Sequence, residues 1–206
     1  MKSLKESILS TTKVGRFDEW NAFKREHAHP KNREELINTI DQAIKLKGSN
    51  VDLNWIDTSK ITIMNALFKS SSFNGDISKW DVSNVKDMSY MFSKSSFNGD
   101  ISKWNIRNVN DVEGMFRDSA FNNDISKWNV SNIKNMYGMF YNSQFNGYIS
   151  EWNVSKVIDM DFMFYGSVFN GDISKWDVSN VVTMSYIFKD CPLEKNPPKW
   201  YKTKSI

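Results

Sequence analysis

Cysteine is nearly missing from this sequence of 206 residues, in which Cys191 is the one example. A single thiol excludes an intramolecular disulfide framework and any structural zinc site built from several thiolates. No histidine lies near Cys191 in the repeat register described below, so the sequence offers no base to activate this thiol as a nucleophile. We expect Cys191 to be a small, buried, apolar residue.

Histidine is also scarce, because the chain has only His27 and His29. No array of cysteines or carboxylates surrounds them, which makes metal binding a weaker interpretation than a solvated connection between two helices. The sequence also lacks a glycine-rich phosphate loop and any serine or paired-acid site in a recognisable context. We expect no metal, no cofactor and no enzymatic activity.

Long apolar runs and a clustered basic stripe are absent as well. No apolar stretch approaches bilayer length, and Lys5 and Glu6 stand where a secretory signal would need its apolar run. The first fifty residues and the tail after Phe188 are each basic by about three charges, whereas the part between them is acidic by about three. The sequence therefore predicts a cytoplasmic or virion-associated protein without a membrane span or a nucleic-acid partner, which would reach a cell surface only by a non-Sec route.

What the chain does contain is a repeat of 24 residues. The segment FNGDISKW begins at Phe73 and Phe97, returns as FNNDISKW at Phe121 and FNGYISEW at Phe145, and appears again at Phe169. Tryptophan keeps the same spacing at Trp80, Trp104, Trp128, Trp152, Trp176 and Trp200. Such a period indicates a repeat architecture in which each unit buries its apolar flank against the next.

Two periodicities follow each other within one unit. The first has the spacing LxxLxLxx and predicts a short strand that points Trp80 and Val82 inward. The second recurs at intervals of three and four and predicts a short helix capped by Asn84, with an apolar face made of Val85, Met88, Met91 and Phe92. The predicted fold class is therefore α/β: a right-handed, leucine-rich-repeat-like solenoid of 24-residue strand–helix repeats with an N-terminal helical cap.

An Asn-Gly pair follows the phenylalanine in most copies of the repeat. Glycine accepts a left-handed backbone without steric penalty, so we expect a positive φ angle at Gly75, Gly99, Gly147 and Gly171. Asn123 supports this expectation, because asparagine is the residue that most often replaces a left-handed glycine. The asparagines of the pair are expected to form a ladder that satisfies loop backbone groups, at Asn74, Asn98, Asn122, Asn146 and Asn170.

Both ends of the array are predicted to be caps. Asn32 and Glu35 form a capping box for a helix that ends at Gly48, with an apolar face of Leu36, Ile37, Ile40 and Ile44. A second short helix is expected around Phe17, Trp20 and Phe23, and the prolines after Cys191 stop the repeat. We therefore divide the chain into an N-terminal helical region and cap (1–50), a repeat solenoid of one half repeat plus five units (51–192) and a degenerate C-terminal cap (193–206).

These units resemble the BspA-like leucine-rich-repeat surface proteins, in particular the mycoplasma-lipoprotein type with FNGDISxWDVSNVxxMxxMF repeats. The resemblance covers about residues 31–202 and includes the exit segment NPPKWY. It implies a leucine-rich-repeat solenoid, a role in adhesion or recognition, and no enzymatic activity. Unlike the surface members, the sequence shows no secretory signal, lipobox or wall anchor.

The outward side chains of the predicted strands, together with Tyr148, form the candidate partner-binding surface. They would line up in columns on the concave face, and a polar, moderately charged surface of that shape suits a protein partner. Differences between copies concentrate at Arg107, Asn123, Tyr148 and Glu151. The candidate residues are Lys79, Asp81, Lys103, Asn105, Arg107, Lys127, Asn129, Tyr148, Glu151, Asn153, Lys175 and Asp177.

Two other columns have a functional interpretation beside a structural one. The aspartates of the FNGD segment recur once per unit, but one carboxylate per turn is too few for calcium, so capping of the turn is favoured. A tryptophan column can bind sugars or ice when it is exposed, but its place in the LxxLxLxx pattern favours burial.

The function predicted from the sequence is non-catalytic protein–protein recognition, with a macromolecular partner bound through the concave strand face. Two alternatives stay open. The first is a structural or decoration protein of a phage particle or an oligomeric assembly, including a homo-oligomer. The second is a bacterial surface adhesin, as the family resemblance implies.

Overall fold

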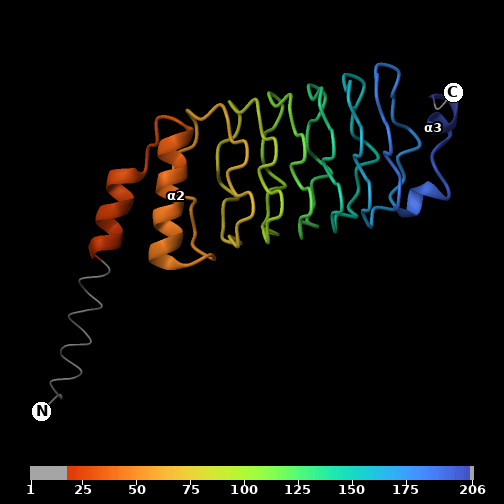
Figure 1. Cartoon of the computed structure of the whole chain (residues 1–206). Helices are drawn as coiled ribbons and strands as arrows, with labels where there is room; N and C mark the ends of the chain where they lie inside the picture. Colours follow the sequence, from red (N-terminus) through yellow and green to blue (C-terminus); the bar gives the residue numbers. More distant parts are fainter. Residues whose placement is uncertain (1–17, 205–206) are drawn as a thin grey trace, which may run out of the picture.

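A stack of irregular coils lies between helices at its two ends (Figure 1). The structure is a computed structural model and describes residues 18–204. Residues 18–27 are helical, α2 spans Arg33–Lys47, the 3₁₀ helix η1 spans Pro192–Glu194 and α3 spans Lys199–Lys204. The predicted domain boundaries stay predictions, and Phe17 lies outside the described residues.

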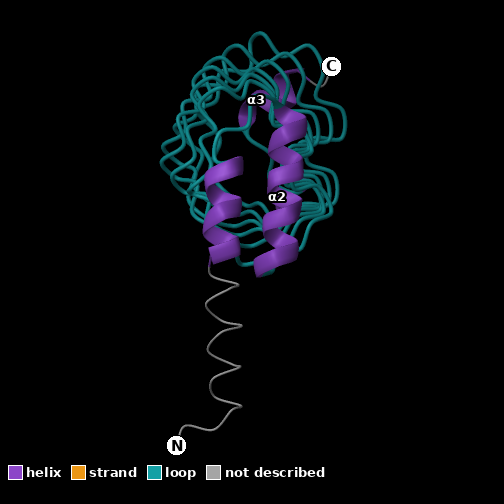
Figure 2. Ribbon diagram, turned by 90° about the vertical axis from the view of Figure 1, so that its left-hand side faces the viewer, coloured by secondary structure: helices purple, strands orange, loops and turns teal. Residues whose placement is uncertain are grey.

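The two N-terminal helices lie side by side across the first coil (Figure 2). As predicted, α2 begins with Asn32 as its N-cap, whose side chain accepts a hydrogen bond from the Glu35 N–H at 3.0 Å. Gly48 ends the helix with a φ of 86°. The buried face of α2 closes the apolar end of the stack and consists of Leu36, Thr39, Ile40 and Ala43.

The predicted α/β fold class is wrong, because the repeats contain neither the strand nor the helix that a strand–helix solenoid requires. Residues 49–191 of the described chain form turns, bends and extended segments. Successive coils are joined in the backbone by isolated parallel bridges, one residue per coil, at Ile63, Asp87, Asp111, Asn135, Asp159 and Thr183.

The predicted helix is absent because its N–H groups bond to the next coil. The N–H groups of Met88 and Phe92 donate to carbonyls 23 residues ahead, at Asp111 (3.0 Å) and Met115 (2.9 Å), and so cannot close helical turns. The helix-like spacing has another cause. Consecutive tight turns close i to i+3 bonds, such as Met91 N–H to Met88 C=O at 3.2 Å, and thereby return apolar side chains inward every three residues.

The predicted strand is absent because its backbone bonds stay within the coil. The Trp80 N–H donates to the Ile77 carbonyl at 3.1 Å, and the Val82 carbonyl accepts from Val85 at 3.0 Å. In the described part of the chain, no backbone–backbone bond joins residues 80–82 to a neighbouring coil. The predicted alternation of burial is nevertheless right, since Trp80 and Val82 are buried while Lys79 and Asp81 are exposed.

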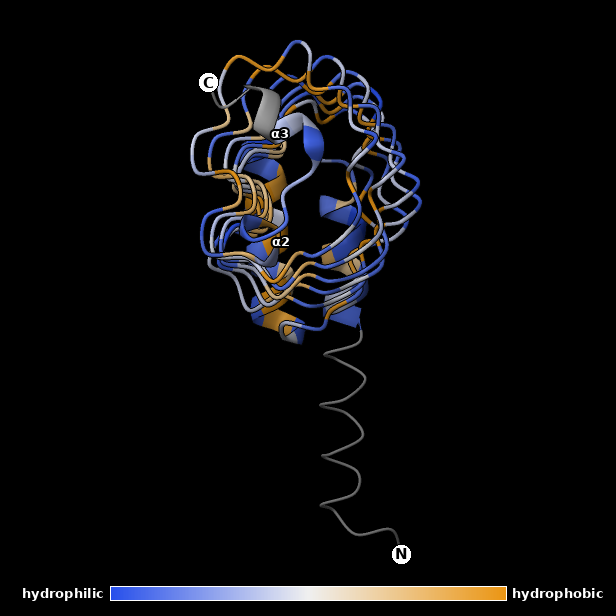
Figure 3. Cartoon of the chain, turned by 90° about the vertical axis from the view of Figure 1, so that its right-hand side faces the viewer, coloured by the Kyte–Doolittle hydropathy of each residue, from blue (hydrophilic) through white to orange (hydrophobic). Residues whose placement is uncertain are grey.

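The core consists of apolar columns in which each side chain stacks on its counterpart 24 residues away. The Trp80 and Trp104 rings lie 6.5 Å apart and nearly parallel, and Phe97 and Phe121 lie 6.3 Å apart. Viewed along the stack, the hydrophobic segments of successive coils lie over one another (Figure 3). Each coil therefore covers the apolar side of its neighbour, as the repeat predicts.

Each buried tryptophan also bonds to the preceding coil. The indole N–H of Trp128 donates to the Ile101 carbonyl at 3.0 Å, and the same bond recurs at the other five tryptophans of the array. The predicted asparagine ladder is present too, since Asn122 accepts from the Asn146 N–H at 2.8 Å. Asn84 does not cap a helix; its amide donates to the Ser59 carbonyl of the preceding coil at 2.8 Å.

The left-handed residues are not the glycines that the sequence predicts. Gly75, Gly99, Gly147 and Gly171 do not have a positive φ. They are small because the phenylalanine two residues earlier folds over them: a Cβ on Gly99 would lie 2.8 Å from the Phe97 ring. The close phenylalanine ring, rather than backbone conformation, therefore favours glycine, although the copy at Asn123 accommodates a side chain.

Two other columns carry the left-handed backbone, at residues four apart in each coil. One contains Ala66, Tyr90, Gly114, Gly138, Phe162 and Tyr186, and the other contains Ser70, Lys94, Asp118, Asn142, Gly166 and Asp190. A left-handed backbone costs about 1–2 kcal/mol for a residue other than glycine. We call the segments that carry these columns and the bridges the ladder face: residues 62–70, 86–94, 110–118, 134–142, 158–166 and 182–190.

In the last coil, a side chain replaces one hydrogen-bond acceptor that the next coil would provide. The N–H groups of Lys94, Asp118 and Asn142 donate to a carbonyl of the next coil. The N–H of their counterpart Asp190 donates instead to the carboxylate of Glu194 in η1, at 3.0 Å. η1 therefore takes the place of the next coil for this one N–H group.

Candidate functional site

All twelve predicted partner-binding residues are exposed. Except for Tyr148, they belong to one segment of each coil, which we call the polar face: residues 79–83, 103–107, 127–131, 151–155 and 175–179. No sheet carries this face, which corrects the predicted concave strand surface. The stacking of the tryptophans beneath it nevertheless aligns the five copies in columns.

The central residue of each copy on the polar face also holds its own turn. Asp81 accepts a hydrogen bond from the Ser83 N–H at 2.9 Å, and the equivalent bonds are made by Asn105, Asn129, Asn153 and Asp177. The lysines before them take no part in this turn. The polar face therefore combines fixed acceptors with cationic side chains that are free of a turn-forming role.

The structure brings two of the predicted residues into contact. The Lys175 ammonium lies 3.3 Å from the Glu151 carboxylate of the preceding coil, and both side chains are about three-quarters exposed. An exposed pair of this kind contributes little to stability. It can therefore open for a partner at small energetic cost.

A hollow of about 450 Å³ lies beside this pair, between two neighbouring coils. Its lining includes Tyr148, Ser150, Asn170, Asp172 and Lys175. Tyr148 stands where the other copies have aspartate, and 87 % of it is exposed. A flat apolar ring beside a cation, a carboxylate and an amide can bind a peptide side chain and its polar backbone groups.

The aspartates of the FNGD column cap turns, as the favoured interpretation predicts. Asp76 and Asp124 accept from the N–H groups of Ser78 and Ser126 at 2.9 and 2.8 Å. These backbone hydrogen bonds are the main cause that lowers the pKa of both carboxyl groups. Within residues 18–204, no group of three or more His, Cys, Asp or Glu side chains could hold a metal ion.

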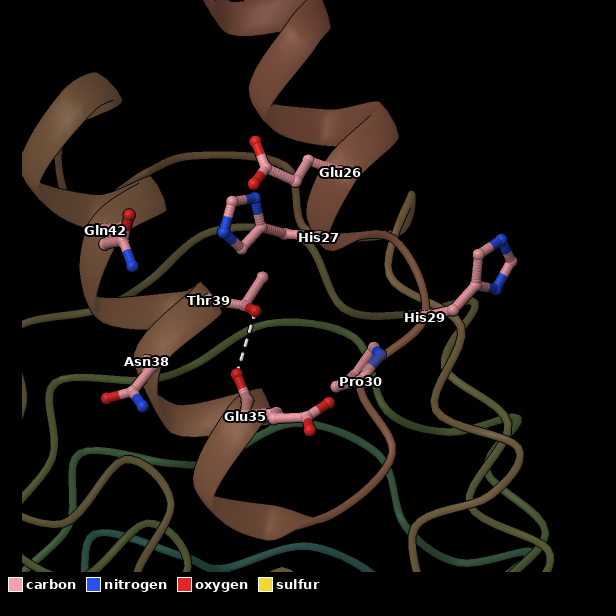
Figure 4. Close-up of a pocket in the computed structure, with 8 residues that line it drawn as sticks. All are labelled: Glu26, His27, His29, Pro30, Glu35, Asn38, Thr39 and Gln42. Atoms are coloured by element: carbon pink, nitrogen blue, oxygen red, sulfur yellow. Dashed lines mark hydrogen bonds between the residues drawn. The ribbon is translucent and has the colours of Figure 1, made fainter.

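A second pocket, of about 350 Å³, lies between the helix of residues 18–27 and α2 (Figure 4). His27 points toward Thr39 and Gln42 of α2, whereas His29 points away from the pocket (Figure 4). His29 Nδ1 lies 3.2 Å from the Asp57 carboxylate. The two histidines therefore do not converge on one ligand.

Two further predictions concern burial and the membrane. Cys191 is buried, as predicted, and burial raises the pKa of its thiol. In the described range 18–204, no helix is long and apolar enough to cross a bilayer.

Sequence reasoning missed the functional potential of the ladder face. Its carboxylates include Asp111 and Asp159, whose pKa is raised chiefly by burial. Burial and a hydrogen bond to Glu113 raise the pKa of Tyr90 to about 12. One signal was present in the sequence: Asp118, Asn142 and Gly166 share a register position, and all three residue types favour a left-handed backbone.

The comparisons with known proteins identify the family and leave its function open. No curated protein and no solved structure matches the chain. A family model described as "Mycoplasma protein of unknown function, DUF285" matches residues 35–144 and again residues 117–206. Two overlapping matches are what a repeated unit produces, and together they cover most of the sequence. The chain therefore belongs to this mycoplasma family of repeat-containing proteins.

Proposed function

We propose that the protein is a non-catalytic recognition module that binds a protein partner through the polar face. The observation that carries this proposal is the separation of two roles along one segment. Trp128 and its counterparts make the core and the indole bonds between coils, while the side chains of Lys127 and its counterparts are exposed and make only one contact between coils, the exposed Lys175–Glu151 pair. The exposed columns are therefore available for contact.

The stacked coils support this role because they hold the columns in place before binding. Bonds between coils fix the spacing of the turns, so a partner meets a preformed surface. Little conformational entropy is therefore lost on association. Arg107, Lys103 and Lys127 give the central copies a positive character, whereas Glu151 changes the sign one coil later. A partner with acidic groups opposite the central coils is the best fit.

The hollow beside Tyr148 supports a protein partner in preference to a flat electrostatic contact. Tyrosine and arginine are enriched among the residues that carry binding energy at protein interfaces, and both Tyr148 and Arg107 are exposed. We infer that Tyr148 provides the main anchor and that the lysines set orientation and association rate.

A charge-reversal experiment tests the proposal. The triple variant Lys103→Glu, Arg107→Glu, Lys127→Glu is immobilised beside the wild-type chain and both are exposed to proteins of the cells that encode it. The expected result is a protein that the wild type retains and the variant loses by about tenfold or more. Equal recovery of every protein by both chains would count against the polar face.

A matched control separates the position of the charges from their number. The variant Lys45→Glu, Lys60→Glu, Lys195→Glu makes the same change in net charge at exposed sites outside the polar face. It should retain the partner. Far-UV circular dichroism of both variants verifies that the coils remain stacked.

The finer resemblance to BspA-like surface proteins supports a second proposal, surface adhesion. Within that proposal the polar face binds a host or matrix protein, and antibody labelling of intact cells tests it. Labelling that appears only after the cells are permeabilised would contradict this second proposal. An assembly formed by end-to-end stacking is less well supported, since α2 covers one end of the stack and Trp200 and Tyr201 pack against Phe188 at the other.

A further inference from the structure

The C-terminal half of the ladder face carries aromatic rings that the fold does not need. Phe162 and Tyr186 are left-handed residues, at φ angles of 57° and 56°, in a column where Gly114 and Gly138 avoid the penalty. Of Tyr186, 57 % is exposed, so its ring gains little from burial. A bulky ring at a strained, exposed position such as Tyr186 points to a function outside folding, and the half-buried Phe162 shares its strained backbone.

These rings form one connected patch. The Phe162 ring stacks on Tyr186 at 5.3 Å and contacts Tyr137 at 5.6 Å and Tyr165 at 6.0 Å, while Tyr165 stacks on Tyr141 at 4.9 Å. We call these five residues the aromatic patch. The same coils carry two exposed aliphatic residues where earlier coils have Lys86 and Lys134, namely Ile158 and Val182.

The charge around the aromatic patch is negative once internal ion pairs are taken into account. In the last four coils of the ladder face, Arg117 pairs with Asp118 at 3.5 Å and Lys189 pairs with Asp190 at 3.7 Å. One further cation, Lys134, lies in these segments. The four remaining carboxylates, those of Asp111, Glu113, Asp159 and Asp161, therefore outnumber the cations that are left.

Hydrogen bonds between successive coils hold three of these carboxylates in place. The Tyr90 hydroxyl donates to Glu113, and the Asn135 amide donates to both Asp111 and Glu113 at 3.3 Å. Asp161 accepts from Thr183 and from the Ser185 N–H, directly before Tyr186. Burial raises the pKa of Asp111 and Asp159, so a cation nearby would favour their ionised form.

The ladder face already shows how its tyrosines receive cations. The Arg117 guanidinium lies 4.1 Å from the centre of the Tyr141 ring, and the Lys69 ammonium lies 5.1 Å from that of Tyr90. Both cations come from the preceding coil. No such contact is present at Phe162 or Tyr186 among the described residues, although their rings continue the same surface.

We propose that the aromatic patch, with Asp159 and Asp161 beside it, binds an extended basic segment of a protein partner, with arginine or lysine side chains over the rings and between the carboxylates. This surface is separate from the polar face and differs from it in chemistry. The polar face offers cations to an acidic partner, whereas the aromatic patch offers rings and carboxylates to a basic one. The two surfaces can therefore be tested independently.

The test uses the full chain and a short fluorescein-labelled peptide in which arginine alternates with serine. Fluorescence anisotropy should show saturable binding that weakens several-fold when the salt concentration rises. A peptide with glutamine in place of arginine should bind at least about tenfold more weakly. Equal binding of the two peptides would overturn the proposal.

Two variants locate the site without risk to the fold. The double variant Phe162→Gly, Tyr186→Gly removes two rings and installs the residue that suits a left-handed backbone, so the chain should stay folded. It should weaken peptide binding by about tenfold. Asp159→Asn copies the natural Asn135 of the preceding coil and should weaken binding several-fold. Unchanged affinity in the double variant would contradict the assignment.

A control on the other surface and one alternative occupant complete the experiment. Tyr148→Ser should bind the arginine peptide like the wild type, while it weakens the partner captured by the polar face. A loss of peptide binding in Tyr148→Ser alone would place the site elsewhere.

Light scattering tests for a second copy of the chain as the occupant of the aromatic patch. A dimer that disappears in Phe162→Gly, Tyr186→Gly would replace the basic peptide by self-association.

Discussion

The polar face and the ladder face are joined from coil to coil by different chemical groups. Beneath and beside the polar face, side chains make the bonds: the indole of Trp128 and the amide of Asn132 each reach a carbonyl of the preceding coil. On the ladder face, backbone N–H groups make a regular series of bonds, as at Gly138, which donates to the Asp161 carbonyl at 2.8 Å, and side-chain bonds such as that of Asn135 to Asp111 only add to them.

This difference explains why the two surfaces vary so unequally between copies. The buried tryptophan column, which supplies both core and bond, keeps its residue at every full copy, and the exposed asparagine column changes once, at Lys156. A column bonded through the backbone can change its side chain freely, and one ladder-face column contains alanine, tyrosine, glycine and phenylalanine. New binding chemistry is therefore easier to acquire on the ladder face.

The tryptophan column gives the strongest test of this difference between the two faces. Trp128→Ala removes a ring that is 4 % exposed together with its bond to the Ile101 carbonyl, and should lower the free energy of unfolding by about 3–5 kcal/mol. Lys127→Ala beside it should change it by less than about 0.5 kcal/mol. Urea unfolding followed by intrinsic fluorescence measures both. Similar losses would refute the division of roles within this segment.

A second substitution asks whether backbone conformation, and not side-chain identity, limits the ladder face. Gly138 has a φ of 53°, and an added Cβ would meet nothing closer than 3.7 Å, so Gly138→Ala tests conformation alone. It should destabilise the chain by about 1 kcal/mol. Lys94→Gly, at a left-handed exposed residue, removes the same penalty and should stabilise the chain by about 0.5–1 kcal/mol. Thermal unfolding that ranks the two in the opposite order would contradict this view.

A third substitution sharpens the contrast at the level of a single hydrogen bond. Asn132→Ala removes the amide that donates to the Arg107 carbonyl at 2.8 Å, and should cost about 1 kcal/mol or slightly less at this exposed site. Lys134→Ala, two residues later on the ladder face, serves as the reference and should be nearly neutral. Chemical denaturation at several temperatures measures the pair, and a neutral Asn132→Ala would show that the side-chain bond is dispensable.

The smallest expected effect depends on pH and has opposite signs at two aspartates. Burial raises the pKa of Asp111, so its ionised form destabilises the folded chain above that pKa, and Asp111→Asn should raise the melting temperature at pH 7. Hydrogen bonds lower the pKa of Asp124, so its ionised form stabilises the folded chain, and Asp124→Asn should lower the melting temperature.

Both differences should vanish in acid, because wild type and variant then carry a neutral group at the same position. The stabilisation from Asp124 is lost as pH falls from its ordinary value of 3.8 through the lower folded pKa. The penalty at Asp111 is already absent below 3.8. Melting temperatures between pH 3 and pH 7 test this, and a constant offset for either variant would refute the electrostatic explanation.

The sequence was sufficient to predict what is buried. The period of 24 residues and the spacing within it correctly placed Trp80 and Val82 in the core and Lys79 outside it. It also located α2, because a capping box and a C-terminal glycine are local signals that act on neighbouring residues. Exposure of all twelve candidate residues followed from the same pattern.

The backbone conformation could not be predicted in the same way. A series of tight turns returns side chains inward every three residues, as a helix does, and the two differ only in where Met88 and Phe92 send their N–H groups. That destination is another coil, which a local pattern does not contain. The role of Gly75 was missed for a similar reason, since its nearest obstacle is the Val51 carbonyl of the coil before it.

The closing bond between Asp190 and Glu194 has a consequence for how such proteins change length. In every internal coil, equivalent N–H groups donate to carbonyls of the next coil. Whole 24-residue units can therefore be duplicated or deleted in frame without a change at either end of the array. The length of the array can then change in steps of one unit. Gene variants of different length should therefore keep the same N-terminal and C-terminal caps.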